Sequence, residues 1–190
     1  MEISIGVSAR HVHIKKEDFE ALFGSDVMLE PEKELTQPGQ FASNNKVTIQ
    51  TEKGSIPNVR ILGPFRSYTQ VELSLTDAYK LGLKPPVRSS GDLKGSSPIT
   101  LVGPKGSISL EEGVILANRH IHITKEERIE KGLENEREVR ILIGGEKGGI
   151  LDHVWIKEAP NSYFELHLDT DDANAHLIQN GDKGEILIEQ

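Results

Sequence analysis

The chain repeats itself, and this constrains its fold more than any other feature. The motif RHVHI at residues 10–14 recurs as RHIHI at residues 119–123. Two further pairs follow in the same order: EKGSI at 52–56 with EKGGI at 146–150, and ELSLTD at 72–77 with ELHLDTD at 165–171, the last with one insertion. Three matched landmarks in one order indicate an internal duplication. We therefore expect two similar units, each containing one copy of the histidine motif.

The hydrophobic pattern between these landmarks is mostly that of β-strands. Ile3, Ile5 and Val7 alternate with small or polar residues, as do Val47 and Ile49, and this period of two is typical of half-buried strands. The apolar run 186–188 predicts a strand that is buried on both faces. Turns rich in Gly and Pro separate many short strands, which favours a barrel or sandwich over a helical bundle. We predict a mainly β protein of two similar β-barrels capped by short helices.

Two short helices and one irregular segment complete the expected organisation. Thr124 and Glu127 have the spacing of a capping box, and Gly132 is placed to end the helix that follows. A second helix is expected over Lys16–Phe23, with Gly24 after it and a weaker start. The segment 88–98 is rich in Ser, Gly and Pro, which predicts either a linker or a long surface loop.

The composition excludes several classes of function. The chain has no cysteine, so it forms no disulfide, thiolate nucleophile, Cys-ligated zinc site or iron–sulfur cluster. Its net charge is −8, and its basic residues are too scattered for a nucleic-acid-binding face. The first residues do not resemble a signal peptide, and no apolar run approaches the roughly 18 residues of a membrane span. We expect a cytoplasmic protein without nucleic acid or membrane partners.

The two H-x-H motifs are the strongest candidates for a chemical function. On an extended segment, residues i and i+2 leave the same face, so His11 lies beside His13 and His120 lies beside His122. Two imidazoles held in this way can chelate a first-row metal ion, and zinc suits such ligands. A single such motif is often a coincidence on a polar strand face. The duplication makes that alternative weaker.

Each histidine pair needs a third protein ligand to form a catalytic type of zinc site, whose fourth position stays open. The candidates are Glu72, His153, His167, His176, Asp169, Asp171 and Asp172. When Glu72 is aligned with Glu165, His167 falls opposite Ser74, on the same strand face as Glu72. His153 and His176 are better explained as solvated histidines of a loop or helix.

Arginines near these motifs are candidates for anion binding. Arg10 and Arg119 directly precede the two histidine pairs, and Arg60 and Arg66 flank the ILGPF turn. A guanidinium offers forked donors for phosphate or carboxylate, although each of these residues could equally be a surface charge. The Gly-rich segments 103–106 and 144–149 match neither a P-loop nor a dinucleotide-binding motif. We predict that they form hairpin turns.

Taken with QPGQ at 37–40, the segment 58–72 and SGDLKGS at 90–96, these motifs give the chain a family resemblance. From Gly6 to about Asp182 it resembles the PduL-type phosphate acyltransferases, also called phosphate propanoyltransferases. The resemblance implies a first barrel at 10–117, with an insertion at about 24–45, and a second barrel at 118–190 that the N-terminal strand 1–9 completes. It also implies two zinc ions at the junction of the barrels, and reversible acyl transfer between coenzyme A and phosphate.

The resemblance also implies the site residues. One zinc ion would be held by His11, His13 and Glu72, and the other by His120, His122 and His167. Arg66 would be the catalytic, phosphate-binding arginine. Coenzyme A contacts would fall on Ser8, Ala9, Arg10, Lys33, Arg60 and Asn174.

Several expectations about mechanism and setting follow. Because the chain has no cysteine to carry an acyl group, we expect direct transfer between coenzyme A and phosphate without an acyl-enzyme. Family members that enter bacterial microcompartments carry an N-terminal amphipathic extension, whereas here the first strand is expected within the first few residues, so we expect an unencapsulated enzyme. Acetate metabolism or propanediol degradation is the expected setting. The choice between acetyl and propanoyl and the formation of a homodimer stay open.

Two other functions fit the same residues. A dinuclear metallohydrolase would use the same ligands to activate water against a thioester or phosphoester. A non-enzymatic metal-binding barrel would bind metal without transferring any group. Phosphate-dependent loss of acyl-CoA, with acyl phosphate as product, distinguishes the acyltransferase from both.

Overall fold

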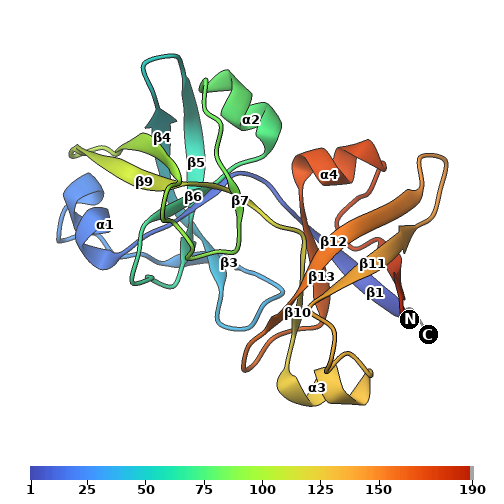
Figure 1. Ribbon diagram of the computed structural model, residues 1–190. Coiled ribbons are helices and arrows are strands. Elements are labelled where there is room, and N and C mark those ends of the chain that lie inside the picture. Colours follow the sequence, from blue (N-terminus) through green and yellow to red (C-terminus); the bar gives the residue numbers. More distant parts are fainter. Residues whose placement is uncertain (189–190) are drawn as a thin grey trace. The chain divides into compact units, whose positions relative to one another are not determined.

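A computed structural model describes residues 1–188 (Figure 1). The chain divides into two compact units, of which one is Ala9–Ala117 and the other combines Met1–Ser8 with the chain from Asn118 onward. We call these the first barrel and the second barrel. None of the helices in residues 1–188 is long and apolar enough to cross a membrane.

The first barrel is a closed ring of six strands. In ring order the strands are β2 (His11–His13), β5 (Ser55–Gly63), β4 (Phe41–Gln50), β8 (Ser97–Val102), β9 (Ser107–Ala117) and β6 (Gln70–Glu72), which pairs again with β2. Two short strands extend the ring: β3 (Pro31–Glu34) pairs with β4, and β7 (Val87–Arg88) pairs with β9. The helices of this unit are α1 (Lys16–Phe23) and α2 (Leu75–Lys80).

The second barrel is also a closed ring of six strands, and the N-terminal strand is one of them. The ring runs through β1 (Glu2–Ser8), β13 (Glu165–Asp169), β10 (His120–Ile123), β12 (Gly149–Glu158), β11 (Glu138–Ile143) and β14 (Lys183–Leu187). Strand β1 is parallel to β13 and antiparallel to β14, which closes the ring. The helices of this unit are α3 (Lys125–Glu130) and α4 (Thr170–Ala175).

The two rings have the same strand order, as the internal duplication predicted. Strand β2 corresponds to β10 and β6 to β13, and each pair forms an antiparallel ladder. His11 lies opposite Glu72 in one ladder, and His120 lies opposite His167 in the other. The alignment of Glu72 with Glu165 is therefore wrong by two residues. A shift of two keeps every side chain on its original strand face, so the expected faces were still correct.

Strand alternation in each barrel separates the core from the histidines. Val12 belongs to the apolar core of the first barrel, and Ile121 belongs to that of the second. Successive side chains of a strand point to opposite faces. The histidines that flank Val12, and those that flank Ile121, therefore point outward from their barrel. Those of β2 are nevertheless buried, since His11 and His13 are only 7% and 6% exposed.

The two predicted helices are present, and two helices that the sequence did not predict, α2 and α4, also begin at capping residues. Thr124 and Glu127 form the expected capping box of α3, and α1 spans the predicted residues without a side-chain cap. Ser74 caps α2, and Asp169 caps α4. A side-chain oxygen at this position satisfies backbone N–H groups that the helix itself leaves without partners.

The structure differs from two expectations for irregular or apolar segments. Most of the segment 88–98 is the loop 89–96 between β7 and β8 inside the first barrel, so the linker alternative is wrong. The prediction that residues 186–188 form a strand buried on both faces is also wrong. Within β14 the buried Gly184 and Ile186 alternate with exposed Glu185, because only one face of a barrel strand meets the core. The strand ends at Leu187, and Ile188 beyond it is 44% exposed. The segments 103–106 and 144–149 do connect antiparallel neighbours, as hairpin turns should.

Candidate metal centres

The first candidate metal centre consists of His11, His13 and Glu72. One ligand atom from each of the three lies within 4.8 Å of the others. The Glu72 carboxylate faces both rings, with 3.4 Å from Oε2 to His11 Nε2 and 3.6 Å from Oε1 to His13 Nε2. Two neighbouring strands thus supply three nitrogen and oxygen ligands, a set that binds zinc in other proteins.

The second candidate metal centre consists of His120, His122 and His167. Their ligand atoms also lie within 4.8 Å of one another, and His120 Nε2 is 3.2 Å from His122 Nε2. The rings of His122 and His167 have centroids 4.5 Å apart. Within residues 1–188, only these two groups bring three possible ligands so close together.

A backbone carbonyl fixes the protonation of the leading histidine in each centre. His11 Nδ1 is 2.8 Å from the carbonyl oxygen of Ala9, and His120 Nδ1 is 2.8 Å from that of Asn118. A carbonyl oxygen can only accept a hydrogen bond, so each Nδ1 carries the proton and donates. The lone pair of each ring is then on Nε2, the atom that faces the other ligands.

An arginine–aspartate pair also recurs beside the two centres. Arg10 donates to Asp77 over 3.0 Å, and Arg119 binds Asp172 with two hydrogen bonds of 2.9 and 2.7 Å. The hydrogen bond and charge of Asp172 raise the pKa of Arg119, although burial opposes this. The fork of Arg119 is thus directed at Asp172, and Arg10 is paired with an aspartate in the same way.

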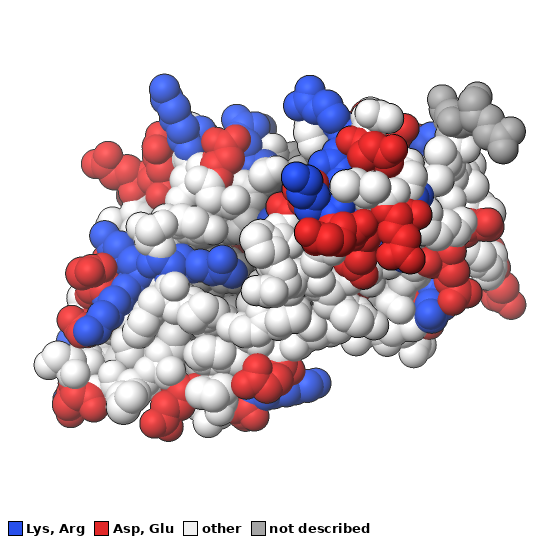
Figure 2. All heavy atoms as spheres, turned by 90° about the horizontal axis from the view of Figure 1, so that it is seen from below, with Lys and Arg blue, Asp and Glu red and all other residues white. Residues whose placement is uncertain are grey.

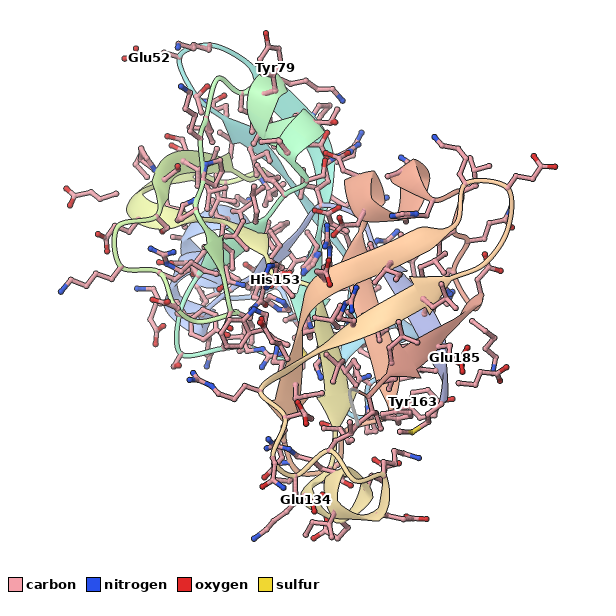
Figure 3. All side chains as sticks on the ribbon, turned by 45° about the vertical axis from the view of Figure 1, so that its right-hand side comes forward. Glu52, Tyr79, Glu134, His153, Tyr163 and Glu185 are labelled. Atoms are coloured by element: carbon pink, nitrogen blue, oxygen red, sulfur yellow. The ribbon has the colours of Figure 1, made fainter. Side chains whose placement is uncertain are left out.

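The remaining candidates for a third ligand have other roles. Asp169 accepts hydrogen bonds from the backbone N–H groups of Asp171 and Asp172, and burial raises the pKa of the Asp169 carboxyl despite them. His153 projects from β12 (Figure 3), and its side chain is 79% exposed. His176 binds the backbone oxygen of Lys147. None of these residues belongs to the two groups of possible ligands found among the described residues.

Arg66 is held next to the end of the first histidine strand. Its backbone N–H donates to the carbonyl oxygen of Ile14, which directly follows His13, over 2.9 Å. The side-chain Nε is buried, and it has no hydrogen-bond partner among the described residues. A buried N–H of this kind costs about 1–3 kcal/mol unless something accepts from it. An anion would supply that acceptor.

The predicted coenzyme A residues divide between the two units. Ser8 and Asn174 belong to the second barrel, at the end of β1 and in α4. The other four belong to the first barrel and are Ala9, Arg10, Lys33 and Arg60. Of these, Arg60 donates to the carbonyl oxygen of Ser43 over 2.7 Å and also pairs with Glu32. Their contacts with coenzyme A stay predictions.

A family model described as phosphate propanoyltransferase matches residues 4–179. The chain belongs to the phosphate propanoyltransferase family. Curated relatives of that name include those of Priestia megaterium, 53% identical with 96% of this chain and 84% of the relative covered, and Thermotoga maritima, 48% identical with 95% and 86% covered. The relative from Listeria monocytogenes is 40% identical, with 97% and 87% covered. The family makes this protein an acyltransferase, so the non-enzymatic alternative is wrong.

Proposed function

We propose that the protein transfers a short acyl group, acetyl or propanoyl, reversibly between coenzyme A and inorganic phosphate, with a zinc ion held at each candidate metal centre. The observation that carries this proposal is the pair of equivalent three-ligand groups on β2 with β6 and on β10 with β13. Three protein ligands leave a coordination position open for a substrate atom, which is the arrangement of catalytic rather than structural zinc sites. The phosphate propanoyltransferase family supports the choice of substrates.

The residues of both centres fit zinc. Their donors are imidazole nitrogens and one carboxylate, which zinc binds well, and the chain offers no cysteine in their place. The carbonyl groups that fix His11 and His120 leave both Nε2 atoms ready to bind a cation. Zinc in these centres would supply a Lewis acid that favours the thiolate form of coenzyme A and so improves the leaving group.

Arg66 is the residue we assign to phosphate. Its buried Nε–H lacks an acceptor among the described residues, and a guanidinium binds phosphate with paired, charge-assisted hydrogen bonds. Phosphate held there would attack the thioester carbonyl carbon through an oxygen atom. The new C–O bond forms, the C–S bond breaks, and the sulfur leaves as the thiolate. Arg66 contributes by positioning the nucleophile and stabilising its charge.

We also propose direct transfer without an acyl-enzyme, which the available side chains favour. The chain has no cysteine, and the histidine rings of each H-x-H pair contact each other. For coenzyme A, we assign the predicted contacts of Ser8, Ala9, Arg10, Lys33, Arg60 and Asn174. Basic and acidic side chains are interspersed over the face shown in Figure 2. An anionic coenzyme would therefore rely on local arginines and lysines, because the net charge is −8.

The experiment that tests this function follows thiol release from acetyl-CoA and propanoyl-CoA, with and without phosphate, and measures acyl phosphate in the same samples. We expect thiol release to require phosphate and to equal acyl phosphate formation. Release without phosphate, with free acid as the product, would instead support the metallohydrolase alternative. Accumulation of acylated protein in the absence of phosphate would replace direct transfer with a two-step scheme through an acyl-enzyme.

A further inference from the structure

The third ligand of each metal centre has a polar neighbour at the same position of the duplicated fold. Gln70 comes two residues before Glu72 in β6, and Glu165 comes two residues before His167 in β13. Gln70 lies opposite His13 in its ladder, just as Glu165 lies opposite His122. Each neighbour therefore shares a strand face with the ligands. Both are buried, with Gln70 at 0% and Glu165 at 6% exposure.

Gln70 and Glu165 differ in hydrogen-bonding type, and each suits the residue that it contacts. Gln70 Nε2 donates to Glu72 Oε1 over 2.6 Å, so a neutral amide supports a carboxylate. Glu165 Oε2 is 2.8 Å from His167 Nε2, so a carboxylate supports an imidazole. A carboxylate oxygen accepts from a ring N–H, so this contact is a hydrogen bond that orients the His167 ring. A donor meets an acceptor in both cases.

The orientation of the Gln70 amide is fixed independently of the metal centre. Its Oε1 accepts from the backbone N–H of Gly91 over 2.7 Å, so Nε2 is the end that faces Glu72. The same Nε2 contacts Ser90 Oγ at 2.9 Å. The loop between β7 and β8, whose sequence was ambiguous, thus holds the amide that supports Glu72.

The Glu165–His167 pair depends on a residue without a side chain. Gly6 of β1 lies opposite His167 in the parallel ladder. A Cβ atom at this position would lie 3.0 Å from Glu165 Oε2 and 3.2 Å from His167 Cδ2. Both distances are shorter than ordinary contacts, so glycine leaves the space that the pair occupies.

From these contacts we propose that Gln70 and Glu165 are positioning residues, each matched to the third ligand of its metal centre. The inference rests on the proposed function, because it presumes that both centres hold zinc. With a divalent ion, the first centre carries one carboxylate as a ligand and the second carries one carboxylate behind a ligand. The first centre has Glu72 as its third ligand and the neutral Gln70 behind it. The second has His167 as its third ligand and the acidic Glu165 behind it, so each centre has one carboxylate.

The test measures metal binding in variants that keep a single centre. His13→Ala removes a ligand of the first centre and leaves the second, and His122→Ala does the reverse. In the His13→Ala background, Glu165→Gln should weaken Zn²⁺ binding about 10- to 100-fold, measured by competition with a chromophoric chelator. In the His122→Ala background, Gln70→Leu should have the same effect. The absorption spectrum of bound Co²⁺ should also change in both, which a purely structural role would not produce.

Controls separate the outcomes. Glu134→Gln, at an exposed position beyond α3 (Figure 3), should leave Zn²⁺ affinity and the Co²⁺ spectrum unchanged. Thermal unfolding of each metal-free variant checks that it folds. If the unsubstituted protein binds two Zn²⁺ ions and both test variants retain full affinity, the positioning role is wrong while the proposed function stands. If the unsubstituted protein does not bind two ions, the proposed function itself fails. Complete loss of binding in Glu165→Gln would make Glu165 a ligand and overturn its positioning role.

Discussion

Replacing Gly6 with alanine probes the second metal centre with the smallest change that the chain allows. The added Cβ would lie 3.0 Å from Glu165 Oε2, 3.1 Å from Glu165 Cδ and 3.2 Å from His167 Cδ2. These three atoms must move away from the added Cβ by a few tenths of an ångström. Because Glu165 Oε2 is hydrogen-bonded to His167, this movement should disturb the candidate centre before it disturbs the barrel core.

The expected magnitudes follow from two opposing effects. Alanine in a strand is favoured over glycine by about 0.5–1 kcal/mol, whereas overpacking a buried site costs about 1–3 kcal/mol. The metal-free Gly6→Ala protein should therefore lose about 0–2.5 kcal/mol of unfolding free energy. Displacing a group that supports a ligand typically costs about 10- to 100-fold in metal affinity. We expect the Zn²⁺ affinity of the second centre to fall at least about 10-fold, and that of the first centre to stay unchanged.

The assay is Zn²⁺ competition with a chromophoric chelator in the two single-centre backgrounds, with denaturant unfolding of the metal-free proteins alongside. Gly144→Ala is the matched control, because a Cβ there meets nothing within 4 Å and the residue belongs to the same unit. It should leave both affinities unchanged. The reasoning is refuted if Gly6→Ala binds Zn²⁺ at the second centre as tightly as glycine does, or if both centres weaken equally.

Three further substitutions test separate parts of the structure. Arg66→Ala should raise the KM for phosphate about 10- to 150-fold, the equivalent of a charged hydrogen bond of about 1.5–3 kcal/mol, with little change in the KM for acyl-CoA; an unchanged phosphate KM would remove Arg66 from the site. Thr124→Ala should lower the unfolding free energy by about 0.5–2 kcal/mol through loss of the α3 capping box, and a denaturant midpoint equal to that of the parent would contradict this. Ser90→Ala should weaken Zn²⁺ binding at the first centre alone, since Ser90 contacts the Gln70 amide; equal effects on both centres would contradict it.

Much of the fold could be predicted from the duplicated histidine motif and the strand periodicity. Alternation alone places Val12 and Ile121 in the cores and the histidines outside them, because a strand has two faces. The expected third ligands, Glu72 and His167, are indeed grouped with the histidine pairs. The capping box of α3 was equally clear, because its signal lies within four consecutive residues.

The register of the duplicated strands could not be predicted in the same way. Aligning identical letters matched Glu72 with Glu165, whereas the backbone ladders match Glu72 with His167. The duplication preserves the position of a ligand and not its chemical type, so identity was a misleading guide. For the same reason the supporting roles of Gln70 and Glu165 were missed. The partner of Arg119 was missed too, because Asp172 lies far away in the sequence and only the fold brings it near.

The most direct test of the account is a titration of metal-free enzyme with Zn²⁺, in which acyl phosphate formation from acyl-CoA and phosphate is measured at each ratio of metal to chain. Each chain contains two groups of three residues that could hold a metal ion. We predict negligible activity without metal and a rise that ends at two equivalents of Zn²⁺ per chain. Full activity in the metal-free protein, or a rise complete at one equivalent, would contradict the two-zinc account.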